Sequence, residues 1–187
     1  PLPALLRLCL DGTDVSQDGL QFLSGSRELS GLLLSGTAIT RGDVLGQFPK
    51  LSMLSVARTS LKTNELQVIR KLPQMGNLSI DARHFSGETA TDIVSLSRLH
   101  TLMLSDANGF DSSILSRLES LKVLKVRKCA ADAIDGAFWK SVAGLRGLES
   151  LSFSDVTDQS LAEVSSMPQL RRFEVTSRSV SGTALAK

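Results

Sequence analysis

A short apolar phrase returns eight times along this chain at a nearly even spacing. Each phrase consists of an apolar residue, two variable residues, a second apolar residue, one variable residue and a third apolar residue, as in Leu29-Leu32-Leu34. The intervals between phrases are 24, 22, 24, 24, 22, 27 and 22 residues, and the phrases start at Leu5, Leu29, Leu51, Met75, Leu99, Leu121, Leu148 and Leu170. Internal periods of about 20 to 50 residues are typical of stacked repeat architectures, so this feature constrains the fold more than any other.

Each repeat carries the signals of one strand and one short helical segment. The last two apolar residues of a phrase are two positions apart, which predicts a short strand with one face buried. A second apolar series at steps of three precedes the strand, as in Leu66, Ile69 and Leu72, and favours a short α or 3₁₀ segment facing inward. One such unit cannot cover its own apolar flank. Stacking therefore buries the flanks in one core and pairs the strands into a parallel sheet on the inner side of a bend.

These phrases resemble the leucine-rich-repeat family, whose pattern is L-x-x-L-x-L-x-x-N/C-x-L, over essentially the whole chain. At the position of the family's Asn or Cys, Cys129 matches the cysteine alternative. Other residues stand there in five repeats, namely Thr13, Thr37, Thr59, Arg83 and Arg178. The phrase SGTAIT with the following Asp43 is similar to the short, Thr-bearing repeats of planctomycete-type bacterial proteins.

The resemblance implies an α/β fold. It would be a right-handed leucine-rich-repeat solenoid of about eight repeats, with a curved parallel sheet on the concave side and short α or 3₁₀ segments on the convex side. We expect residues 1–187 to form a single domain of this kind. The chain begins almost at a repeat strand and stops part way through the eighth unit, with no evident polar capping unit. We therefore expect a segment of a longer protein, the alternative being ends shielded by self-association.

Composition is typical of a globular protein and disfavours several classes of partner. Hydrophobic residues make up 42% and charged residues 21% of the chain. A net charge of +2 and a 4% aromatic content give little support for nucleic-acid binding. No apolar run approaches the roughly 18 residues that a membrane span needs. The two cysteines, Cys9 and Cys129, fall five coils apart, which is roughly 24 Å at the spacing of neighbouring strands, so we expect no disulfide between them.

A search for catalytic chemistry finds little. His84 and His100 are the only histidines, and neither belongs to a readable Ser-His-Asp or Cys-His set, so we expect both at the surface. Two histidines and two distant cysteines do not supply a metal site. The Gly-rich stretches lack the signature of a phosphate-binding loop. We therefore expect no catalytic residue, no cofactor and no metal.

Three local motifs are interpreted structurally. Arg41-Gly42-Asp43 falls where a repeat turns from strand to helix, and Asp43 suits the cap of the short helix. Asn77-Leu78-Ser79 is a glycosylation sequon on a predicted strand, where a glycan would occupy the inner surface. Trp139 aligns with inward-facing leucines of other repeats and should pack in the core.

The inner surface of the sheet is the candidate site. Residues that alternate with the buried pair should point outward. Leu33, Met53 and Met103 are then apolar where solvent is expected, which favours contact with a protein. Basic residues gather toward the C-terminal strands, namely Lys125, Arg127, Lys128 and Arg172, and could attract an acidic partner. The alternative is a solvated sheet face without function.

The leading hypothesis is a protein-interaction scaffold that binds a partner protein on its concave sheet through Leu33, Met53, Met103, Lys125, Arg127 and Arg172. The alternative is a structural spacer or targeting module within a larger multidomain protein. An enzyme is the least favoured class. The identity of the partner and the oligomeric state are left open.

Overall fold

The computed structural model describes residues 2–107, 110–128, 134–154 and 163–176. Eight strands pair in parallel to form one sheet, and they follow one another in sequence order from β1 to β8. The strands are β1 (Arg7–Cys9), β2 (Gly31–Leu33), β3 (Met53–Ser55), β4 (Asn77–Asp81), β5 (Thr101–Ser105), β6 (Val123–Arg127), β7 (Ser150–Ser154) and β8 (Arg172–Thr176).

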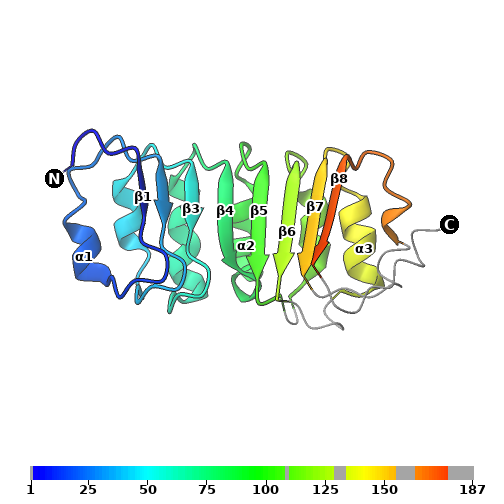
Figure 1. Ribbon diagram of the computed structural model, residues 1–187, viewed down its shortest axis with the longest axis horizontal. Coiled ribbons are helices and arrows are strands. Elements are labelled where there is room, and N and C mark those ends of the chain that lie inside the picture. The colour runs from blue at the N-terminus through cyan, green and yellow to red at the C-terminus, as the bar shows by residue number, and fades with distance from the viewer. Residues whose placement is uncertain (1, 108–109, 129–133, 155–162, 177–187) are drawn as a thin grey trace.

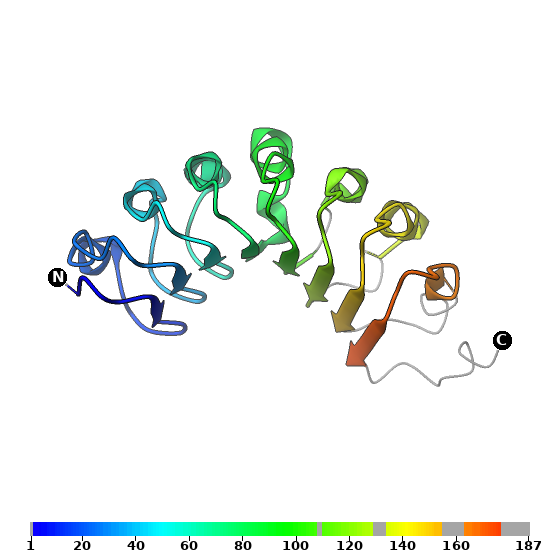
Figure 2. The same ribbon diagram turned by 90° about the horizontal axis from the view of Figure 1, so that it is seen from above.

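Short helical segments return the chain from one strand to the next. They are α1 (Gln17–Gln21), α2 (Gly87–Val94), α3 (Gly136–Ala143) and the 3₁₀ segments η1 (Asp43–Gln47), η2 (Thr63–Lys71), η3 (Ala82–His84) and η4 (Ser112–Arg117). The strands lie side by side in front of the helical layer (Figure 1). Seen from above, the strands line the inner side of an arc and the helical segments its outer side (Figure 2). The predicted curved solenoid is therefore confirmed.

The register of the sheet stacks the middle leucine of each phrase on that of the next. Leu32 pairs with Leu54, and Leu54 with Leu78, in an unbroken row that continues through Leu102 and Leu124. These five side chains are at most 2% exposed. The equivalent residue of β1, which has a neighbouring strand on one side only, is half-buried. The core of each coil is therefore completed by the coils beside it.

Threonines at the strand exits bond within their own coil. The hydroxyls of Thr13, Thr37 and Thr59 each donate to the carbonyl three residues earlier, at 2.8, 2.7 and 2.8 Å. Arg83 instead reaches across coils, and its guanidinium donates to the carbonyl of Thr59 at 3.1 Å. These bonds satisfy backbone oxygens at the strand exits that the sheet leaves unpaired. Cys129 and Arg178 lie outside the described residues.

Aromatic side chains fill the later coils. Phe138 contacts both Trp139 and Phe153, with ring centroids 5.5 and 5.7 Å apart. Trp139 is 4% exposed, so its predicted place in the core is confirmed. Edge-to-face contacts extend this cluster to Phe110 and Phe173. The large rings occupy the wider coil around α3, where the repeat interval rises to 27 residues.

The turns that follow β1, β2, β3, β5 and β6 each use one residue with positive φ. This residue stands four positions after the middle leucine in five coils, with φ of 69° at Gly12, 71° at Gly36, 57° at Arg58, 50° at Asp106 and 50° at Lys128. Glycine adopts this conformation freely, whereas a residue with a Cβ gives up about 1 to 2 kcal/mol. Three coils therefore carry a side chain where glycine would be less strained.

The Arg41-Gly42-Asp43 segment is packed against the next coil. A Cβ on Gly42 would lie 1.9 Å from the backbone oxygen of Glu65, and the Gly42 amide donates to the Glu65 carboxylate at 2.9 Å. Asp43 is the first residue of η1, and Gly42 holds the cap position, so the cap predicted for Asp43 is wrong. The carboxylate of Asp43 accepts bonds from the side chains of Arg41 and Gln17 and from the amide of Val44. Close packing between coils accounts for the glycine of this tripeptide.

We expect Gly42→Ala to destabilise the fold. The added methyl group would meet backbone, which cannot rotate away, so the free energy of unfolding should fall by about 2 to 3 kcal/mol, the upper part of the range for overpacking. Urea denaturation followed by circular dichroism measures this change. Gly136→Ala is the control, because a Cβ there meets nothing within 4 Å. Equal midpoints for the two variants would contradict the packing argument.

Candidate functional site

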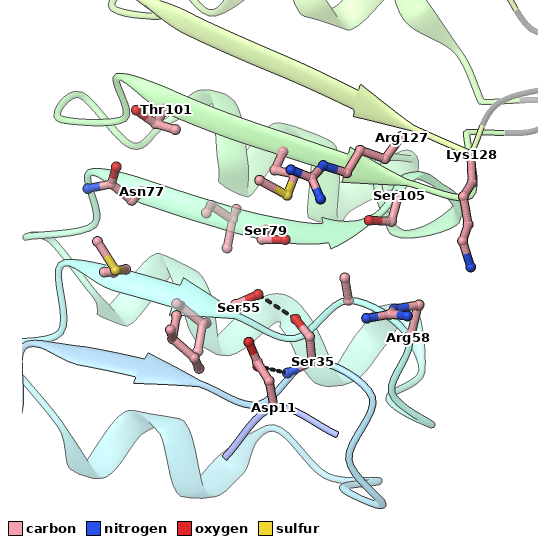
Figure 3. A pocket seen from close by; sticks show the side chains of 16 residues that line it. Asp11, Ser35, Ser55, Arg58, Asn77, Ser79, Thr101, Ser105, Arg127 and Lys128 are labelled. Carbon is pink, nitrogen blue, oxygen red and sulfur yellow. Dashed lines mark hydrogen bonds between the residues drawn. The ribbon is translucent and has the colours of Figure 1, made fainter. Parts of the chain in front are cut away.

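A shallow groove of about 480 Å³ lies on the concave face of the sheet. Strands β2 to β5 supply most of its lining, and the end of β6 supplies its basic margin (Figure 3). Apolar side chains form the floor together with small polar ones. The groove is therefore an open, mixed surface with no enclosed cavity at its centre, a form that suits the extended surface of a macromolecule.

The sheet register brings the three predicted apolar residues into this groove. Each of the three stands next to the buried middle leucine of its strand, Met53 before it and Leu33 and Met103 after it. Side chains alternate along a strand, so all three project from β2, β3 and β5 on the face opposite the leucines. Between the methionines, β4 contributes the half-buried Asn77 and Ser79 to the lining, beside the buried Leu78. These smaller side chains leave a depression bordered by flexible, apolar ones. Leu33, Met53 and Met103 are half-buried as well.

The carboxyl ends of the strands are more enclosed than the alternation predicts. Ser35, Ala57, Asp81 and Ser105 were expected to point into solvent, yet they are 8%, 3%, 3% and 8% exposed. Parallel strands lie only about 4.8 Å apart, and residues at these ends bond to neighbouring coils, as the Ser35 hydroxyl does with that of Ser55. The carboxylate of Asp11, for example, accepts a bond from the Ser35 amide at 2.6 Å.

Three cations form what we call the basic rim, namely Arg58, Arg127 and Lys128. All three line the groove and are exposed. Arg58 follows β3, and the other two stand at the end of β6. Figure 3 shows Arg58 and Lys128 at the same end of the strands, with the Arg127 side chain lying over the sheet. Among the described residues, none of the three forms a salt bridge.

The groove brings together four of the six residues proposed from the sequence. Leu33, Met53, Met103 and Arg127 line it. Lys125 pairs in register with Met103 but is not part of the lining. Arg172 lies two strands further on, where its Nε donates to the carboxylate of Glu174 at 2.7 Å. The proposal that these six residues bind a partner stays a prediction.

Sequence reasoning missed Arg58, because it stands in a turn and not on a strand. The signal that could have found it is its alignment with Gly12 and Gly36, which marks a left-handed position. Asn77 lies on β4 in the groove floor, as the sequon argument expected, so a glycan at this position would fill the groove.

The expectation of two surface histidines is half wrong. His100 is exposed, but His84 is only 1% exposed. Its Nδ1 lies 3.2 Å from the hydroxyl of Thr63, and its Nε2 is buried without a hydrogen-bond partner in the part of the chain that is described. Burial, and secondarily the neighbouring charge of Arg83, lower the pKa of His84 below its ordinary 6.5, while Asp81 opposes this shift. No carboxylate bonds to the second ring nitrogen, so Thr63 and His84 do not form a triad.

Within the described ranges, no group of three His, Cys, Asp or Glu side chains is placed to hold a metal ion. In the same residues, no helix combines the length and the apolar character that crossing a bilayer requires. Cys9 is a free, exposed thiol on β1.

The recurring triplets, the eight-stranded parallel sheet and the helical outer face define a leucine-rich-repeat solenoid. Among solved structures, an internalin C2 from Listeria monocytogenes is similar, with a TM-score of 0.59 and 20% identity over 100% of this chain and 78% of that chain. A second internalin from the same species has a TM-score of 0.57 and 16% identity, over 96% of this chain and 63% of that one. The likeness at these identities is one of fold. No protein-family model and no curated protein matches the sequence.

The buried His84 predicts that acid weakens the fold. The pKa of His84 is lower in the folded protein than in the unfolded chain. Below pH 6.5, therefore, the imidazole of His84 binds a proton more readily in the unfolded chain than in the folded protein. Stability is therefore complete above 6.5 and decreases as pH falls toward the folded pKa, by at most about 1.4 kcal/mol per pH unit. Urea denaturation at about pH 7.5 and about pH 5.5 measures the loss.

We expect His84→Gln to reduce this pH dependence, because Gln keeps a polar group near Thr63 but does not titrate. The matched control is His100→Gln, which removes an exposed histidine and should leave the dependence as in the wild type. A pH dependence unchanged by His84→Gln would show that other groups cause it.

Proposed function

We propose that this protein is a protein-interaction module that binds an extended segment of a partner protein in the concave groove. The observation that carries this proposal is the convergence of Leu33, Met53 and Met103 on one open face of a rigid sheet. Adjacent apolar side chains on a surface favour association, and the flexible thioether of Met adapts to differently shaped partners.

The setting of the groove supports a macromolecular partner. It spans several strands and is open along its length, whereas small-molecule sites usually enclose most of their ligand. Small polar side chains such as Ser55, Ser79 and Thr101 stand between the apolar ones and can bond to a peptide backbone. Similarity of fold to two internalins is compatible with a scaffold role without assigning a partner.

An enzymatic role has less support. The described residues assemble no nucleophile with an oriented base, and the groove holds no histidine. Its one carboxylate, that of Asp11, is engaged by a backbone amide of the next coil. A binding surface therefore accounts for the groove better than a reaction centre does.

Changing both methionines to lysine should weaken binding strongly without unfolding the protein. A phage-displayed library of random peptides selects ligands, and fluorescence anisotropy then compares their affinity for wild type and for the Met53→Lys, Met103→Lys double variant. Because two charges would replace the apolar contacts at the centre of the groove, we expect a loss of about tenfold or more.

The matched control is Gln47→Lys with Asn64→Lys, which adds the same charge to exposed positions of η1 and η2 on the convex side. This control should bind like the wild type, and both variants should keep the wild-type denaturation midpoint. Selected peptides that bind the methionine variant as tightly as the wild type would refute the groove as the binding site.

A further inference from the structure

We infer that the basic rim binds carboxylate side chains of the bound segment, so that the partner presents an acidic, extended stretch of protein to the groove. This inference rests on the proposed function and adds the chemistry of the partner. It depends on three observations: the conformation of Arg58 and Lys128, the lack of counter-charges around the rim, and the distance between its two halves.

The first observation is that two rim residues occupy left-handed positions. Coils one and two place glycine there, at Gly12 and Gly36, whereas coils three and six place Arg58 and Lys128 with φ of 57° and 50°. Glycine would satisfy the turn with less strain, as it does in the first two coils. Strained backbone persists most often where the side chain serves a function. In place of glycine, Arg58 and Lys128 each put a cation at the margin of the groove.

The second observation is that the rim charges are not neutralised by the described part of the chain. Basic residues elsewhere do find partners, as Lys50 does with Glu28 at 2.6 Å and Arg172 with Glu174. The buried carboxylate of Asp81 accepts the backbone amide of Arg58 at 2.8 Å and lies 3.5 Å from the guanidinium of Arg83. It therefore holds the Arg58 turn in place without pairing with the Arg58 side chain.

The groove's lining contains three cations and one carboxylate, that of Asp11, which already accepts the Ser35 amide. Asp106 occupies the equivalent left-handed position in the fifth coil, but it does not line the groove. Open cations beside an apolar floor complement a segment that combines carboxylates with apolar side chains. A basic or purely apolar segment would leave them desolvated and unpaired.

The third observation is the spacing of the rim. Arg58 follows β3, and Arg127 and Lys128 end β6, so three strand intervals of about 4.8 Å, or roughly 14 Å, separate the two halves. An extended peptide crossing the strands advances about 3.3 Å per residue and covers that distance in about four residues. Residues four apart on an extended chain project from the same face. The rim therefore suits two acidic residues four positions apart.

Peptides taken from the random library test the charge preference directly. Each recovered peptide is compared with a copy in which every Asp and Glu is replaced by Asn and Gln. We expect the amide copies to bind wild type about tenfold more weakly, because each loses charge-assisted hydrogen bonds to the rim. We further expect affinity for the acidic peptides to fall with added salt.

Rim variants assign the preference to residues. Arg58→Gly and Lys128→Gly should each lower affinity for acidic peptides about three- to tenfold, reduce the acid-to-amide difference and raise the denaturation midpoint, since glycine relieves the positive φ. Arg58→Lys should keep most of the affinity. The matched control is Asp106→Gly, which relieves the same backbone strain but removes no cation, and should retain full affinity.

The outcomes separate the two proposals. If peptides bind in a methionine-dependent way but their amide copies bind equally well, the acidic partner is refuted, while the groove remains the binding site. If acidic peptides lose affinity equally in Arg58→Gly and in Asp106→Gly, the rim assignment is overturned. If no peptide binds in a methionine-dependent way, the groove is refuted as the binding site, and the acidic partner is refuted with it.

Discussion

Burial of each coil's apolar flank by its neighbours is the interaction on which this structure depends. No coil holds a complete core of its own. Leu54 is 1% exposed because Leu32 lies on one side and Leu78 on the other, in one continuous row. The same residue in β1 has a neighbour on one side and is only half-buried. A stack of this kind gains stability from each added interface and forces the strands into register.

The register determines what the free face of the sheet can do. Because side chains alternate along a strand, the strand residues between the buried ones fall into columns on the concave side. Met53, Asn77 and Thr101 form one column, and Ser79 and Met103 belong to the next. Widely separated residues in the sequence thus become neighbours at the spacing of strands. The rigid stack holds them in place, and a partner need not order them on binding.

The turns that follow the strands both complete the fold and carry residues of the candidate site. At these turns the sheet leaves backbone groups unpaired, and side chains from neighbouring coils satisfy them, as Asp81 does for the amide of Arg58 and Ser154 for that of Lys128 at 2.8 Å. The turn positions are structurally demanding, which is why glycine holds two of them. The cations at two further turns, Arg58 and Lys128, therefore combine a structural position with exposure at the groove margin.

The sequence by itself determined the fold class, the strand positions and the apolar residues of the groove, because repeats of 22 to 27 residues bury their apolar phrases by stacking. It could not decide exposure at the strand ends, where Ala57 and Ser105 are buried. Nor could it reveal that His84 is buried or that Arg58 and Met103 line the same groove. Those outcomes depend on contacts between coils more than twenty residues apart, and only the packed tertiary structure brings such residues together.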